Sequence, residues 1–130
     1  MPNQFDAWMK SLTLARWSQG QHNIDPEDFL ARARAGEKML LLDIRFPEEQ
    51  TFVALPQSLH IPLNELPDRW QEIPSDGVVA IVCGSGQRAT VAYVYLQNKG
   101  LDNVKVLNGG LAMLVQALNP ATVWAMTHKG

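Results

Sequence analysis

Cysteine is the scarcest reactive residue: the 130-residue chain has one, Cys83. A single thiol excludes a disulfide within the chain, so any reaction of Cys83 needs a partner from outside. The three histidines, His22, His60 and His128, are dispersed, and with one thiol they form no metal-binding pattern of recognisable spacing. We therefore expect neither a metal nor another cofactor.

Charged residues and long apolar runs are also in short supply. Charged residues make up 18% of the chain, its net charge is −2, and the lysines and arginines are scattered. Without a basic stripe to neutralise phosphates, a nucleic-acid partner is not expected. No apolar run approaches the ~18 residues that span a bilayer, and the opening residues MPNQFDAWMK include an acid and no leader-type apolar block. We expect a cytoplasmic protein without membrane contact.

Apolar residues, at 46% of the chain, suffice for one compact domain, and their pattern predicts strands. MLLLDI at 39–44 and VVAIVC at 78–83 are unbroken apolar runs, typical of strands covered on both faces in a parallel sheet. VKVL at 104–107 predicts a third such strand, and residues 59–61 predict a short one.

Helices are predicted between these strands. Apolar residues at helical spacing indicate an amphipathic helix over 4–17, and Asp25 with the proline after it indicates the start of a helix over 26–35. Residues 88–99 favour a strand by propensity, but parallel neighbours need a long crossover, so we predict a helix. A last helix is predicted over 111–118. This alternation indicates an α/β domain with a mainly parallel sheet.

The pattern divides the chain into three parts. We expect an N-terminal helical extension over 1–23, one domain over 24–118 and a tail over 119–130. The extension either covers the domain's own sheet or serves a partner. The first alternative is favoured because apolar patches of monomers are normally covered.

The stretch VCGSGQRA places Cys83 between a predicted strand and the next helix, where sites gather in parallel α/β sheets. Gly84 and Gly86 allow the loop to curl until backbone N–H groups point inward, and the helix adds its positive end. These groups are expected to favour the thiolate of Cys83, which is the nucleophilic form. The simpler alternative is that Cys83 is a small buried core residue. A Walker phosphate loop is excluded because its Gly-Lys-Ser/Thr ending is missing.

Five segments follow one another in order between about residues 24 and 114. They are DPEDFLARARAG, LLLDIRFPEEQ, LPQSLHIPL, VVAIVCGSGQRA and LDNVKVLNGGLAML. Together they resemble the rhodanese-like domain of single-domain sulfurtransferases. The resemblance implies a three-layer α/β domain, in which a mainly parallel central sheet is flanked by helices.

The same resemblance implies a chemistry for the loop. In that family the loop cysteine takes a sulfane sulfur from a donor, holds it as a persulfide and passes it to a thiophilic acceptor such as cyanide or a thiol. By position, Cys83 is the implied catalytic nucleophile. The residues implied to bind the donor are Gly84, Ser85, Gly86, Gln87 and Arg88.

Asp43 and Arg45 stand in the segment that resembles the family's Asp-Val-Arg, so they are implied to support the site. The simpler alternative is a structural ion pair with Glu48 or Glu49. A neighbouring carboxylate is also expected to hold Arg88 and thereby fix the shape of the loop.

Loop length favours sulfur over phosphate chemistry. Four residues lie between Cys83 and Arg88, as in sulfur-transferring members, whereas related cysteine phosphatases have five. Many single-domain members have arginine where this chain has Gly84, and the CGSG start resembles 3-mercaptopyruvate sulfurtransferases. The donor therefore stays open between thiosulfate, 3-mercaptopyruvate and a persulfide.

The sequence thus predicts a sulfurtransferase whose partners are a small sulfur donor and a thiol or cyanide acceptor, with an acceptor protein as a further candidate. The alternative is a noncatalytic rhodanese-like module for partner binding or persulfide sensing. The complete loop around Cys83 favours the enzyme, while Gly84 and the N-terminal extension keep the module open.

Overall fold

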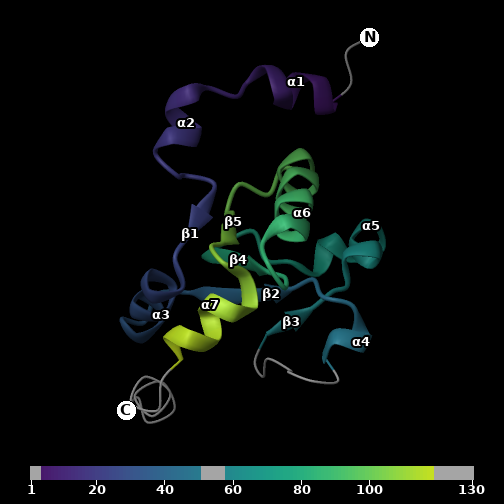
Figure 1. Cartoon of the computed structure of the whole chain (residues 1–130). Coiled ribbons are helices and arrows are strands. Elements are labelled where there is room, and N and C mark those ends of the chain that lie inside the picture. Colours follow the sequence, from purple (N-terminus) through teal and green to yellow (C-terminus); the bar gives the residue numbers. More distant parts are fainter. Residues whose placement is uncertain (1–3, 51–57, 119–130) are drawn as a thin grey trace.

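A parallel sheet forms the centre of the computed structural model, which describes residues 4–50 and 58–118 (Figure 1). The described strands form one five-stranded sheet in the order β1-β5-β4-β2-β3, and every neighbouring pair is parallel. The strands are β1 (Asn23–Ile24), β2 (Met39–Asp43), β3 (Leu59–His60), β4 (Val78–Val82) and β5 (Val104–Leu107).

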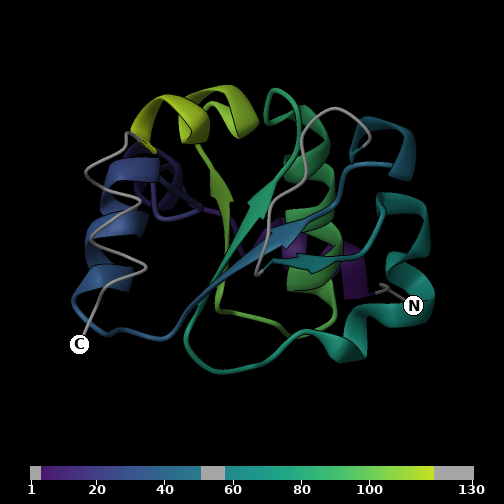
Figure 2. The same ribbon diagram turned by 90° about the horizontal axis from the view of Figure 1, so that it is seen from below.

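Helices connect the strands and cover both faces of the sheet. They are α1 (Gln4–Lys10), α2 (Leu14–Ser18), α3 (Pro26–Arg34), α4 (Pro47–Gln50), α5 (Leu66–Arg69), α6 (Gln87–Asn98) and α7 (Gly110–Ala117), with 3-10 turns η1 (Leu63–Glu65) and η2 (Trp70–Glu72). Figure 2 shows α3 and α7 on one side of the sheet and α6 on the other. The three-layer α/β fold is therefore confirmed.

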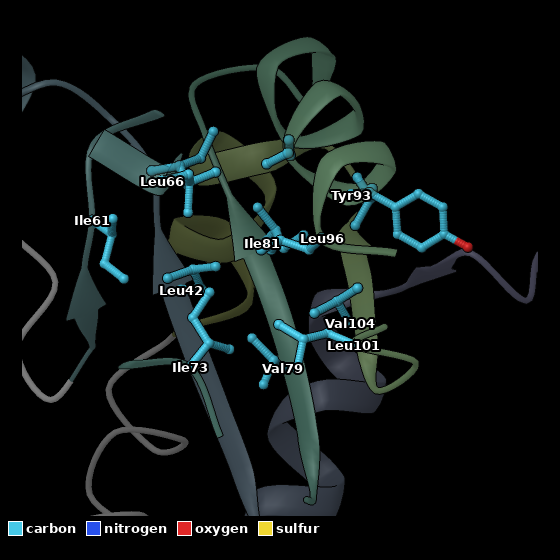
Figure 3. Packing of buried hydrophobic residues seen from close by; sticks show 14 of the residues in the cluster. Leu42, Ile61, Leu66, Ile73, Val79, Ile81, Tyr93, Leu96, Leu101 and Val104 are labelled. Carbon is cyan, nitrogen blue, oxygen red and sulfur yellow. The ribbon is translucent and has the colours of Figure 1, made fainter. Parts of the chain in front are cut away.

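The alternating sides of β4 explain why its sequence is apolar throughout. Val79 and Ile81 pack into the cluster under α6, whereas Ala80 and Val82 pack into the cluster under α3 and α7. Successive side chains of a strand point to opposite faces, so a strand covered on both faces needs apolar residues at every position. Figure 3 shows the α6 side of this core.

Most predicted elements are confirmed to within a residue or so at each end. The strands predicted over 39–44, 78–83 and 104–107 are β2, β4 and β5, and the short strand near 59–61 is β3. The helices predicted over 26–35, 88–99 and 111–118 are α3, α6 and α7.

The single helix predicted over 4–17 is wrong. The chain forms two short helices instead, because Thr13 caps the second one: its Oγ1 accepts a hydrogen bond from the Arg16 amide at 3.2 Å. A side chain that bonds the backbone in this way stops the preceding helix and starts a new one. The two-residue strand β1 was also not predicted.

The N-terminal extension packs on the domain's own helix α6. Trp8 of α1 contacts the core cluster beneath α6, and Gln4 donates a hydrogen bond to the Asn98 carbonyl at the end of that helix. The extension thus contacts the domain itself, but through helix α6, whereas the sequence favoured a cover directly on the sheet. The three-part division of the chain itself stays a prediction, and the tail at 119–130 lies outside the described residues.

Across the described part of the chain, no helix has the length and apolar character needed to cross a bilayer.

Candidate active site

Cys83 follows the carboxyl end of β4 and is fully buried. Its Sγ accepts hydrogen bonds from the backbone amides of Gly86 at 2.9 Å and Ala89 at 3.4 Å. Cys83 also belongs to the apolar cluster under α6, so the burial expected of a lone cysteine is confirmed. An ordinary core thiol needs no such donors, and two amides aimed at the sulfur stabilise a negative charge there.

The loop takes its shape from Gly86, which has φ +107° at the N-cap of α6. L residues with a side chain rarely adopt this conformation, and here it turns the Gly86 amide toward the sulfur. The 12-residue helix α6 begins at the next residue and directs its positive end toward Cys83. The Gly86 amide and the N-terminus of α6 thus both favour a negative charge on the Cys83 sulfur.

At Gly84 the lack of a side chain matters for space, whereas at Gly86 it matters for the backbone conformation. A Cβ at this position would lie 3.3 Å from Nη2 of Arg88, so a side chain here would press on the guanidinium. The exposed residues Gly84, Ser85 and Gln87 form the outer surface of the loop, above the buried sulfur. The absence of a side chain at Gly84 therefore leaves room for the Arg88 guanidinium.

Arg88 is held by Glu49, which follows β2 on α4. The Nη1 and Nη2 atoms of Arg88 each donate to one Glu49 oxygen at 2.7 Å, and the Phe46 amide donates to Glu49 Oε2 at 2.8 Å. The Arg88 hydrogen bonds are the main reason that the pKa of Glu49 falls from 4.5 to about 2, and the Phe46 amide adds to this effect. The expected carboxylate partner of Arg88 is thus Glu49, and it ties the loop to α4.

Asp43 and Arg45 are both buried and pair with one another. Arg45 Nη2 lies 2.9 Å from Asp43 Oδ2, and Gln50 Nε2 donates to the same oxygen at 2.9 Å. Their ion pair is thus with one another, where the simpler alternative named Glu48 or Glu49, and the charge of Arg45 contributes to the lowered pKa of Glu49. The ring Nε2 of His60 lies 2.7 Å from the Arg45 carbonyl oxygen, so the pair braces the ends of β2 and β3 near α4.

The start of α7 supports the loop from the other side, which sequence reasoning missed. The Leu111 amide donates to the Cys83 carbonyl at 2.8 Å. Gly110 has φ +60°, and a Cβ there would lie 2.6 Å from the carbonyl oxygens of both Cys83 and Gly84. The paired glycines at 109 and 110 were the available signal, because only a residue without a side chain permits this approach.

A pocket of about 280 Å³ lies beside the loop. Loop residues Ser85, Gly86 and Gln87 line one part of it, and His22 and Asn108 line another. Burial lowers the pKa of His22, and the charges of Arg16 and Lys105 lower it further.

Among residues 4–50 and 58–118, no three histidine, cysteine or acidic side chains are grouped so as to hold a metal ion.

The sequence is similar to those of known proteins. The family model described as "Rhodanese-like domain" matches residues 25–117. A sulfurtransferase of Allochromatium vinosum is 39% identical over 90 residues, which cover 69% of this chain and 84% of that protein. A putative sulfurtransferase of Bacillus subtilis, YtwF, is 30% identical over 81 residues, covering 62% of this chain and 79% of that protein.

A solved structure shows the same fold. The crystal structure of a rhodanese-related protein from Thermoplasma volcanium superimposes with a TM-score of 0.66 at 28% sequence identity. The match covers 76% of this chain and 95% of that one. The family model covers the loop at residues 83–88, and the solved structure shares the fold.

Proposed function

Since this chain belongs to the rhodanese-like domain family, we propose that it is a sulfurtransferase that carries sulfur as a persulfide on Cys83. The observation that carries the proposal is the pair of amides from Gly86 and Ala89 that donate to the Cys83 sulfur. A thiolate is the nucleophilic form of cysteine, and a fixed set of amides stabilises it without a separate base.

The first half-reaction loads Cys83. With thiosulfate as donor, the thiolate attacks the outer sulfur, a bond from Sγ to that sulfur forms, and sulfite leaves with the electron pair of the broken S–S bond. With 3-mercaptopyruvate, the C–S bond breaks instead, and the pyruvate enolate takes up the proton that the donor thiol loses. Both routes leave a persulfide within reach of the loop amides.

The second half-reaction removes the outer sulfur from the Cys83 persulfide. Cyanide or a thiolate attacks the outer sulfur, the S–S bond to Sγ breaks, and Cys83 regains its electron pair as a thiolate. Because the chain has one cysteine, no second thiol of the same chain displaces the sulfur. The acceptor is therefore a separate molecule.

Access to the sulfur requires movement of the loop, since Cys83 is fully buried. Because Gly84, Ser85 and Gln87 are exposed and the Arg88–Glu49 pair anchors the end of the loop, we expect the movement at these three residues. The burial of Cys83 also favours a second candidate, a noncatalytic module that binds a partner through the loop surface.

One experiment separates the two candidates. The protein is incubated with thiosulfate or with 3-mercaptopyruvate, its intact mass is measured, and thiocyanate is assayed after cyanide is added. The sulfurtransferase gains the mass of one sulfur atom and forms thiocyanate, and Cys83→Ser abolishes both. A native protein that stays unmodified with every small donor, persulfides included, is instead the binding module.

A further inference from the structure

A second pocket, of about 370 Å³, lies where the N-terminal extension meets α6 and β5. Arg16 and Gln21 line it from the extension, ahead of the family match at 25–117. Its described lining residues are Arg16, Gln21, Tyr93, Gln97, Asp102, Val104 and Lys105. Its size falls within the range of small-molecule sites, which starts at roughly 300 Å³.

The hydrogen-bond partners of Arg16 in this pocket are uncharged side chains. Its Nη2 donates to Gln97 Oε1 at 2.9 Å and to the Tyr93 hydroxyl oxygen. Gln97 is fixed in this orientation because its Nε2 donates to the Leu101 carbonyl at 3.2 Å. Within the described parts of the chain, Arg16 forms no ion pair, so its positive charge is not balanced by a carboxylate.

Lys105 is the second cation, and its partner is also neutral. Its Nζ donates to the Gln21 carbonyl oxygen at 2.7 Å, and no carboxylate of the described residues lies within ion-pair distance. Burial lowers the pKa of Lys105, the guanidinium groups of Arg32 and Arg16 lower it further, and the carboxylate of Asp28 offsets a part of this. The two pocket cations therefore repel each other.

Hydrogen-bond donors also exceed acceptors. Tyr93 uses its oxygen to accept from Arg16, so its O–H remains to donate, and Figure 3 shows this hydroxyl directed away from the core cluster. Asp102 is the acidic residue of the lining, but it is exposed and forms no ion pair with Arg16 or Lys105. Partly buried cations are normally paired, but no carboxylate of the described residues lies within ion-pair distance of Arg16 or Lys105.

We propose that this pocket binds a small organic anion whose carboxylate or phosphate group lies between Arg16 and Lys105. The Tyr93 hydroxyl is a third donor to that group. The site is separate from the Cys83 loop and does not depend on sulfur transfer. Since Arg16 belongs to the N-terminal extension, the extension has a binding role in addition to covering α6.

The test uses amide NMR shifts of the full chain during titration with inorganic phosphate and, separately, succinate. Amides are expected to shift at residues 21 and 104–106, in a saturable way, with at least one of the two anions. Shifts at 84–89 report any binding to the loop, so the two sites are read independently. A response to phosphate alone identifies a phosphate group as the anion that the pocket binds, and a response to succinate alone identifies a carboxylate.

Matched variants make the test specific. Arg16→Gln and Lys105→Gln are each expected to weaken binding at least about tenfold, since a lost hydrogen bond to a charged group is worth about 1.5–3 kcal/mol. Asp102→Asn removes a negative charge from the lining and is expected to tighten binding. Lys99→Gln is the control, because Lys99 is a cation outside this pocket that lies over the Trp70 and Tyr95 rings.

Two results overturn the proposal. One is the absence of saturable shifts at residues 21 and 104–106 with either anion. The other is equal affinity in wild-type protein, Arg16→Gln, Lys105→Gln and Lys99→Gln, which shows that the anions only screen surface charge. Thermal unfolding of each variant confirms that a loss of binding is not a loss of fold.

Discussion

Glu49 and Arg88 join α4 to the active-site loop through two hydrogen bonds of 2.7 Å. The depressed pKa of Glu49 makes this link sensitive to acid, because protonation removes the charge that Arg88 binds. A carboxyl group with a folded-state pKa below its unfolded value stabilises the fold above the unfolded value and loses that contribution as pH falls. For Glu49 the loss runs from pH 4.5 down to about 2.

We predict that Glu49→Gln flattens the acid limb of the stability curve in this pH range. Both side chains are about one third exposed, at 33% and 35%, so solvent screens the pair. Its worth at neutral pH is therefore about 0.5–1 kcal/mol. Urea unfolding at a series of pH values measures this difference. Glu48→Gln, at the exposed neighbouring position of α4, is the control, and identical acid profiles for the two variants contradict the prediction.

The residues of the site could be predicted where they are close to one another in the sequence. Cys83, its glycines and Arg88 are adjacent in sequence, so their spacing alone places them on one loop. The partner of Arg88 is 39 positions away, and sequence reasoning expected a carboxylate there without choosing Glu49. For Asp43 and Arg45 the sequence left an ion pair with Glu48 or Glu49 as the alternative, because their spacing in the sequence does not reveal that the two residues pair with one another.

At the scale of elements, α7 acts on the site through its first residue. Gly110 touches two carbonyl oxygens of the loop, and these are backbone atoms that cannot rotate away. We predict that Gly110→Ala lowers stability by about 2–4 kcal/mol, from a left-handed conformation and a backbone clash together. Sulfur transfer should fall as well, because relief of the clash displaces the Cys83 carbonyl.

The control for this prediction is Gly100→Ala. Gly100 also has positive φ, at +88°, but a Cβ there meets nothing within 4 Å. That variant is expected to lose about 1–2 kcal/mol from backbone strain alone, with sulfur transfer unchanged. Equal losses in urea unfolding for the two variants, with activity intact in both, exclude a close fit between α7 and the loop.

Helices and strands could be predicted where their length and apolar pattern, or their place between parallel strands, indicated them. Strands β2, β4 and β5 are four or five residues long and apolar on both faces, which makes them visible in the sequence. Helix α6 was predicted correctly against its β-branched and aromatic residues because a parallel crossover requires a helix. The break between α1 and α2 depends on one Thr13 hydrogen bond, and apolar spacing carries no information about it.

At the scale of the whole molecule, the sheet separates two apolar clusters and the extension adds to one of them. Trp8 packs against the cluster under α6, and Arg16 bonds Tyr93 and Gln97 of that helix. A truncated variant that starts at Gln21 is predicted to keep a cooperative fold but to lose about 2 kcal/mol, as expected for partial exposure of a large side chain.

This truncation also tests the predicted boundary between extension and domain. Circular dichroism and thermal unfolding measure whether the fold survives, and the thiocyanate assay measures whether the loop still works. Retained activity with a lowered melting temperature shows that the domain folds without the residues ahead of Gln21, and that its boundary lies at or after this residue. An unfolded truncated variant shows instead that the extension is an integral part of the domain.

The buried sulfur of Cys83 has a practical consequence for measuring motion in this protein. Because the chain has one thiol and that thiol is fully covered, a thiol-specific reagent in native buffer reports a single event, the opening of the loop. When opening is in rapid equilibrium, the native labelling rate is the population of the open state multiplied by the reactivity of the exposed Cys83 thiol, so a change in this rate with conditions reports a change in that population. The chain therefore contains its own site-specific probe of loop exchange, with no engineered label.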